Sequence, residues 1–124
     1  MAENAPTLQQ VADMAARGML EQMQRCHGES PSGYLNCLYS DSAGNHCAIG
    51  WALTPELQAQ VGGFLGDVYE LLVAFPSVRA YFADCQFTDL KRLQEIHDIK
   101  LPENWRDALR TFYSQRGLTF PQDV

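Results

Sequence analysis

Apolar residues recur at intervals of three and four along most of this chain of 124 residues, and this spacing constrains the fold most strongly. Such a period places apolar side chains on one face of an α-helix. In the first segment the apolar positions are Leu8, Val11, Ala12, Ala15, Met19 and Met23. Thr7 and Gln10 have the form of a capping box. We therefore predict an amphipathic helix of about five turns that ends near His27-Gly28.

The second half of the chain predicts further helices. Thr54-Pro55-Glu56 combines a hydroxyl cap, a proline at the first helical position and an acid near the positive end of the helix dipole. This helix should weaken at Gly62-Gly63. Helical spacing continues over residues 64–75, where Pro76 ends the helix, and over a short segment, 77–84. Two further helices are predicted. One covers 89–98 with Thr88 as its cap, and the other covers 103–115 and ends at Gly117.

Residues 34–50 break the helical period. The apolar segment 34–39, the turn-rich residues 40–45 and the segment 46–50 are typical of a β-hairpin. With the turn centred on Ser42, Cys37 lies opposite Cys47, and Leu35 and Tyr39 share their face. Helical periods cover most of the chain and one alternating pair of segments is visible, so the chain is predicted to be mainly α. Its 46% of hydrophobic residues is typical of a compact globular domain. We expect a single compact domain over 1–124, with five or six helices, one small hairpin at about 34–50, a flexible leader at 1–6 and a loose tail at 118–124.

The excess of acidic over basic residues lies entirely in the first part of the chain, residues 1–78. The net charge is −6, and no Lys or Arg occurs between His27 and Val78. The acids in this stretch are Glu29, Asp41, Glu56, Asp67 and Glu70. Nucleic acid is a poor partner for such a segment, because binding a polyanion relies on Lys and Arg. A basic protein surface is a better partner, and the alternative interpretation is that these acids keep the domain soluble.

The sequence gives no sign of a membrane or secreted protein. The first residues lack the basic segment and the apolar segment of a secretory signal peptide. The longest apolar run, Leu71–Phe75, is too short to cross a bilayer. We therefore expect a cytoplasmic protein whose thiols are reduced and which does not bind membranes.

Cys37 and Cys47 allow three interpretations. They are small buried residues, a cross-strand disulfide, or zinc ligands together with His46, Cys26 or His27. Nine residues separate the two cysteines and no C-x-x-C motif is present, so zinc is the weakest interpretation. The sequence therefore predicts no metal and no cofactor.

One combination of residues could support catalysis. Cys47, His97 and Asp98 are the residue types of a thiol nucleophile, its base and a group that orients the base. Neighbouring residues on a helix point about 100° apart, so Asp98 is poorly placed to orient His97. We predict no enzymatic activity and keep thiol chemistry at these residues as the alternative.

A set of short motifs resembles small, mostly uncharacterised proteins of bacteriophages and prophages. The motifs are Cys37-x-Tyr39, Gly44-x-x-Cys47-Ala48-Ile49-Gly50, Leu93-Gln94-x-x-His97-Asp98 and Trp105, within residues 35–117. The resemblance implies an accessory protein of a mobile element and no established activity. Together with the acidic segment, it suggests an inhibitor that binds a basic surface of a host nucleic-acid-binding defence complex, as an anti-CRISPR protein does. The alternatives are the thiol enzyme, a small structural or regulatory phage protein, and a sponge for a signalling nucleotide that uses Arg79, Lys91, Arg92 and Arg106.

Overall fold

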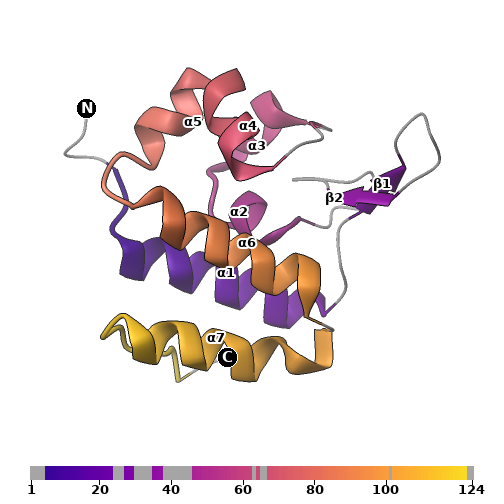
Figure 1. The fold of residues 1–124 in the computed structure, drawn as a ribbon. Helices are drawn as coiled ribbons and strands as arrows, with labels where there is room; N and C mark the ends of the chain where they lie inside the picture. Colours follow the sequence, from indigo (N-terminus) through magenta and orange to yellow (C-terminus); the bar gives the residue numbers. More distant parts are fainter. Residues whose placement is uncertain are drawn as a thin grey trace.

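Three long helices form one half of the molecule and four short helices form the other half (Figure 1). This computed structural model describes residues 5–23, 27–29, 35–37, 46–62, 64, 67–100 and 102–122. The long helices are α1 (Leu8–Gln22), α6 (Phe87–Ile99) and α7 (Trp105–Gln115), which pack side by side. The short helices are α2 (Ala48–Trp51), α3 (Pro55–Val61), α4 (Val68–Ala74) and α5 (Pro76–Tyr81), and a 3-10 turn, η2 (Pro102–Asn104), precedes α7. The predicted mainly α, single-domain architecture is confirmed, with seven α-helices in the described residues instead of five or six.

Helix α1 begins as the sequence predicts. The Gln10 N–H donates to Thr7 Oγ1 at 3.2 Å, and the Thr7 N–H donates to Gln10 Oε1 at 2.9 Å. The helix ends earlier than predicted, because Met23 adopts a left-handed conformation with φ 53° and its N–H donates to the Met19 carbonyl. The capping box is therefore confirmed, and the predicted end near His27 is wrong.

The starts of the later helices follow their local signals in most cases. Thr54 caps α3 with Pro55 in its first turn, and α3 ends at Gly62, whose φ is 53°. Helix α4 is shorter than the predicted 64–75, because Asp67 caps it and starts it at Val68. Thr88 is not the cap of α6 as predicted, since this helix already begins at Phe87.

The predicted hairpin over 34–50 is wrong. Strand β1 (His27–Glu29) pairs antiparallel with β2 (Leu35–Cys37), and the Cα partner of Cys37 is His27. Residues 48–50, predicted to lie in the second strand, belong to helix α2. The Gln22 side chain binds both backbone groups of His46, at 2.8 Å and 3.0 Å, so the chain enters α2 directly after a contact with α1. The predicted turn at 40–45 lies outside the described residues.

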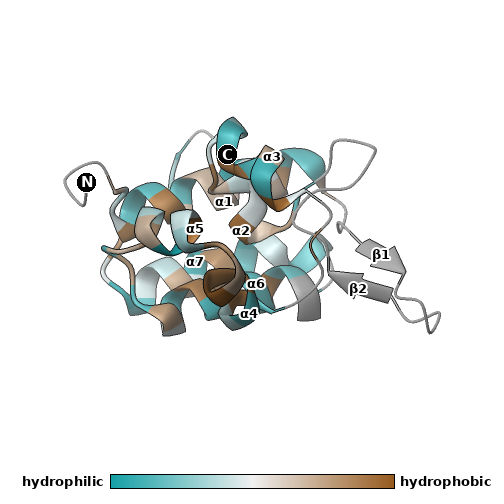
Figure 2. Cartoon of the chain, turned by 90° about the horizontal axis from the view of Figure 1, so that it is seen from above, coloured by the Kyte–Doolittle hydropathy of each residue, from teal (hydrophilic) through white to brown (hydrophobic). Residues whose placement is uncertain are grey.

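The core lies between α1, α2, α6 and α7. Its largest fully buried side chains include Trp105, Tyr113, Phe112, Met19 and Ile49. Figure 2 shows that hydrophobic stretches of the helices turn towards the middle of the helical body and that hydrophilic residues predominate on its outside. None of the helices in the described ranges is long and apolar enough to cross a membrane.

The segment after α7 returns to the helices. The Thr119 N–H donates to Gln9 Oε1 at 3.0 Å, and Gln9 Nε2 donates to the Thr119 carbonyl at 2.9 Å. The Phe120 ring packs edge to face on Tyr113, with centroids 5.1 Å apart. Residues 118–120 are therefore attached to α1 and α7, which corrects the prediction of a loose tail for this part.

Candidate functional site

The structure places Cys47 and His97 in the core. Cys47 caps α2, where its Sγ accepts the Gly50 N–H at 3.3 Å, and its side chain is 0% exposed. The His97 ring, also 0% exposed, stacks on Trp105 with centroids 5.4 Å apart. The side chain of Asp98 lies outside the described part. Both residues are fully buried, so this geometry gives no support to thiol catalysis.

A buried amide explains the motif around His97. Gln94 lies one turn before His97 on α6, is 5% exposed, and accepts the Ile49 N–H with its Oε1 at 3.2 Å. This hydrogen bond satisfies a backbone group in the first turn of α2. Gln94 of the Leu93-Gln94-x-x-His97 motif therefore links α6 to α2.

The structure describes the side chains of two of the suggested zinc ligands, Cys47 and His46. Cys47 caps helix α2 and Cys37 pairs with His27, so the predicted cross-strand pairing of Cys37 with Cys47 is wrong. The His46 ring packs edge to face on Trp51, with centroids 4.6 Å apart. Among the described side chains, no group of three His, Cys, Asp or Glu residues could hold a metal ion. Cys26 and the side chains of His27 and Cys37 lie outside this set.

Two of the five acids proposed for partner binding also cap a helix. The Glu70 N–H donates to Asp67 Oδ1 at 2.8 Å, and the Asp67 N–H donates to Glu70 Oε1 at 3.0 Å. Both side chains are exposed, as is Glu56 in the first turn of α3. The Glu29 side chain and Asp41 lie outside the described residues. Asp67 and Glu70 thus stabilise α4 and still present negative charge to solvent.

The molecule exposes large apolar side chains beside this cap. Tyr69 and Val73, four residues apart on α4, are 63% and 62% exposed, and Phe87 at the start of α6 is 38% exposed. The Tyr69 and Phe87 rings meet edge to face with centroids 6.2 Å apart. We call Tyr69, Val73 and Phe87 the apolar strip. Exposed patches of this kind mark binding surfaces when they are contiguous.

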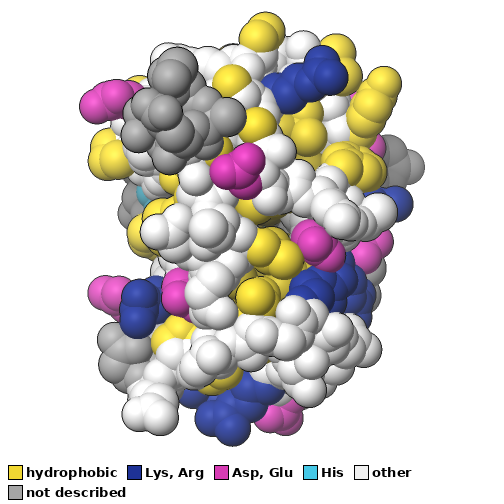
Figure 3. Space-filling model, turned by 90° about the vertical axis from the view of Figure 1, so that its left-hand side faces the viewer, with side chains coloured by type: hydrophobic (Ala, Val, Ile, Leu, Met, Phe, Trp, Pro, Cys, Tyr) yellow, Lys and Arg dark blue, Asp and Glu magenta, His cyan; other side chains and the backbone are white. Residues whose placement is uncertain are grey.

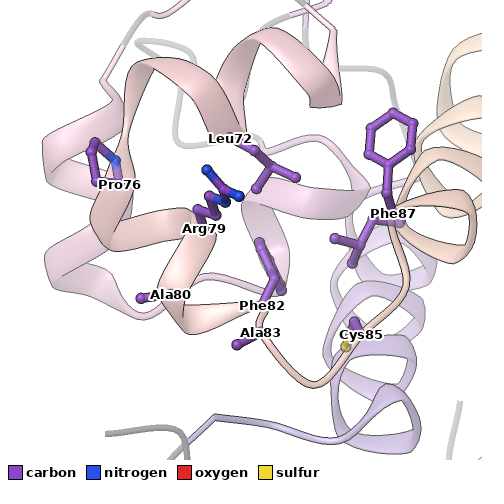
Figure 4. A pocket seen from close by; sticks show the side chains of 9 residues that line it. Leu72, Pro76, Arg79, Ala80, Phe82, Ala83, Cys85 and Phe87 are labelled. Carbon is purple, nitrogen blue, oxygen red and sulfur yellow. The ribbon is translucent and has the colours of Figure 1, made fainter.

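A cavity of about 530 Å³ adjoins the apolar strip. It lies between α4, α5 and the start of α6, and its lining includes Leu72, Pro76, Arg79, Phe82 and Phe87 (Figure 4). Figure 3 shows hydrophobic side chains gathered around a basic side chain on the upper part of one face of the molecule. The size of the cavity is within the range of small-ligand and peptide-anchor pockets, which is roughly 300–1,000 Å³.

Arg79 is the one charged residue among those described as lining the cavity. Its side chain is exposed and forms no hydrogen bond or ion pair with another described residue. In Figure 4 the guanidinium projects from α5 towards the region of Leu72. Within the described part of the chain, the cavity thus combines one cation that has no partner with mostly apolar walls.

Cys85 lines the same cavity as a neutral thiol. Its Sγ lies 3.8 Å from the Pro6 carbonyl. Burial raises the pKa of Cys85 to about 11, and the negative charges of Asp84 and Asp89 contribute further. At neutral pH this cysteine is therefore protonated and a poor nucleophile.

The four basic residues suggested for a nucleotide sponge do not form one pocket. Arg92 lines a separate polar cavity of about 310 Å³ with Lys100, Asn104 and Thr111, whereas Arg79 lines the apolar cavity. Lys91 and Arg106 line neither of these two cavities. Arg92 also forms an ion pair with Glu95 at 3.7 Å. The arrangement therefore gives no support to a shared phosphate site built from these residues.

The sequence prediction missed the apolar strip, although a signal for it exists. The buried face of α4 is formed by Val68, Leu71 and the half-buried Leu72. Tyr69 and Val73 lie off this face at a spacing of four residues. Two apolar residues on the polar side of a short helix are the sequence pattern that could have indicated this binding surface.

Comparisons of the chain with protein-family models, with curated proteins and with solved structures found no match. The assignment of a site therefore rests on the geometry and chemistry of these residues.

Proposed function

We propose that this is a phage-type accessory protein that acts in the host cytoplasm by binding another protein, and that the apolar strip is the centre of its binding surface. The observation that carries the proposal is the exposure of Tyr69 and Val73, at 63% and 62%. Aromatic residues commonly anchor protein interfaces, and Phe87 extends the surface across to α6.

The charge beside the strip favours a basic partner. Glu70 is exposed on the same helix as Tyr69 and Val73, and its carboxylate accepts the Asp67 N–H at the start of α4. Asp67 and Glu56 add exposed negative charge on α4 and α3. A basic groove that binds nucleic acid complements such a surface. A host defence complex of the CRISPR kind is the partner that we propose, and occupation of its groove would compete with nucleic acid.

The test is an infection assay in bacteria that carry an active CRISPR system directed against the infecting phage. We expect expression of the protein to restore phage plating and the double variant Tyr69→Ala/Val73→Ala to abolish this restoration. The double variant Ser114→Ala/Gln115→Ala, at two exposed positions of α7, is the matched control and should retain activity. Failure of the wild-type protein to restore plating, or full activity of the strip variant, would contradict the proposal.

A second experiment separates charge from helix capping. Glu56→Gln/Asp67→Asn/Glu70→Gln removes three charges and retains side chains that can form the capping hydrogen bonds. We expect association with the purified defence complex to slow about tenfold at low salt, because complementary charge accelerates encounter. Surface plasmon resonance at low and high salt measures this effect. An unchanged association rate at low salt would exclude the electrostatic part of the proposal.

A further inference from the structure

We propose that the cavity between α4, α5 and α6 binds the carboxyl terminus of a protein partner, with an apolar last side chain inside the cavity and its α-carboxylate on Arg79. This inference rests on the proposed function, because it specifies which part of a bound partner the cavity receives. It adds a ligand chemistry that the apolar strip alone does not define.

The cavity and the apolar strip are continuous. Phe87 lines the cavity, and its ring also meets Tyr69 on the exposed surface with centroids 6.2 Å apart. A protein bound to Tyr69 and Val73 therefore lies directly beside the mouth of the cavity. This continuity favours a segment of the same partner as the occupant over a free small molecule.

The composition of the walls defines the ligand. Leu72, Pro76 and Phe82 supply apolar contact, while Arg79 supplies the one charge among the described lining residues. A guanidinium binds a carboxylate through two parallel hydrogen bonds, and the Arg79 side chain has no partner among the described residues that would compete. Cys85 adds no negative charge at neutral pH, since burial raises its pKa. One cation in apolar walls matches a group that is apolar and carries one negative charge.

A carboxyl terminus supplies both an apolar group and one negative charge within a single residue. Its α-carboxylate is joined to the same Cα atom as the last side chain, so charge and apolar group enter together. An internal Asp or Glu would need a neighbouring residue to fill the apolar part of the cavity. The cavity, at about 530 Å³, has room for a large apolar side chain and the adjoining backbone.

The inference can be tested with the full chain and three small probes. The probes are N-acetyl-leucyl-phenylalanine with a free carboxylate, the same dipeptide as its carboxyl-terminal amide, and decanoate. Binding is followed by the chemical shifts of backbone amides in titrations observed by nuclear magnetic resonance. We expect the free acid to shift Leu72, Arg79 and Phe87 saturably, and the amide to bind about tenfold more weakly because it lacks the charge.

Substitutions in the cavity identify the groups responsible. Arg79→Gln should reduce binding of the free acid to the level of the amide, and Ala80→Leu should fill part of the cavity and weaken both peptides. Arg92→Gln is the matched control, because this half-buried arginine lines another cavity and should not alter binding. Circular dichroism verifies that each variant is folded.

Each outcome bears on the inference separately from the proposed function. No saturable shift with the free acid would overturn the cavity as a peptide site. Equal binding of acid and amide, or no effect of Arg79→Gln, would overturn the role of the carboxylate. Tighter binding of decanoate than of the peptide acid would overturn the choice of a protein terminus. The infection assay with the variant of Tyr69 and Val73 tests the proposed function alone.

Discussion

Gly18 determines how closely α1 and Trp51 approach. A Cβ atom added at Gly18 would overlap Cγ and Cδ2 of Trp51. The indole cannot easily move aside, because its Nε1 donates to Gln22 Oε1 at 3.0 Å and its face is packed against the His46 ring. A glycine in the middle of a helix usually costs about 1 kcal/mol relative to alanine. At this position the contact with Trp51 outweighs that cost.

We predict that Gly18→Ala lowers the free energy of unfolding by about 1–3 kcal/mol, despite the better helix propensity of alanine. Urea denaturation measures the change. The control is Trp51→Ala in the same background, where the added methyl group no longer overlaps the indole and the effect of Gly18→Ala should become small. A variant as stable as the wild-type protein would show that Trp51 can move aside.

The environments of Cys47 and Cys85 predict slow alkylation by iodoacetamide in the folded protein at pH 7. Cys47 is fully buried, and Cys85 remains protonated because its pKa is raised to about 11. The modification rate of Cys85 should increase with pH up to about 11, whereas an ordinary thiol levels off nearer pH 9. Mass spectrometry of labelled peptides measures each site. Rapid labelling of Cys47 that depends on His97 would contradict this prediction and support the alternative of thiol catalysis.

At the scale of single elements, α4 depends on its cap. It has seven residues, and a helix this short is marginal in water without tertiary support and satisfied ends. The reciprocal hydrogen bonds of Asp67 and Glu70 satisfy two backbone N–H groups at its start. The same helix carries Tyr69 and Val73, so the cap also positions the apolar strip.

We predict that Asp67→Ala destabilises the protein by about 1 kcal/mol, because it removes the cap of α4. Asp67→Asn is the matched control and should cost much less, since asparagine caps helices nearly as well without the charge. Urea denaturation of the two variants distinguishes the causes. Equal destabilisation by both substitutions would assign the effect to charge instead of capping.

At the scale of the whole molecule, hydrogen bonds join α1 to α7 and to the segment that follows α7. The Tyr113 hydroxyl on α7 donates to Asp13 Oδ1 on α1 at 2.7 Å. Burial is the main cause that raises the pKa of Tyr113, and this hydrogen bond raises it further. Gln9 binds Thr119 beyond the end of α7. The segment after α7 is thus part of the same packing unit as α1.

We predict that deletion of residues 118–124 lowers the free energy of unfolding by about 1–3 kcal/mol. The loss comes from the partly buried Phe120, its contact with Tyr113 and the two Gln9 hydrogen bonds. Urea denaturation measures it, and Phe120→Ala alone should reproduce most of the effect. Unchanged stability after truncation would mean that these contacts contribute nothing.

The amino-acid sequence by itself determined where most helices lie and which faces they bury. Thr7 with Gln10, and Thr54 with Pro55, act on backbone groups within the same helical turn. The period of apolar residues likewise defines a helix face over a few turns. Such signals are local in the chain, and the predicted caps at Thr7 and Thr54 agree with the structure. The predicted end of α1, the extent of α4 and the Thr88 cap do not.

Only the tertiary structure decided the features that depend on distant partners. Residues 48–51 form a helix beside Gln22 and Gln94, which are 24 to 45 residues away from the groups they bind. Arg79 follows the segment without Lys or Arg, yet it lines a cavity with Phe87 beside the apolar strip. Cys47 and His97, which the sequence combined into a catalytic alternative, are both buried in the core. Hydrogen bonds and packing between elements that are far apart in the chain decide these features, and no local pattern of residues contains that information.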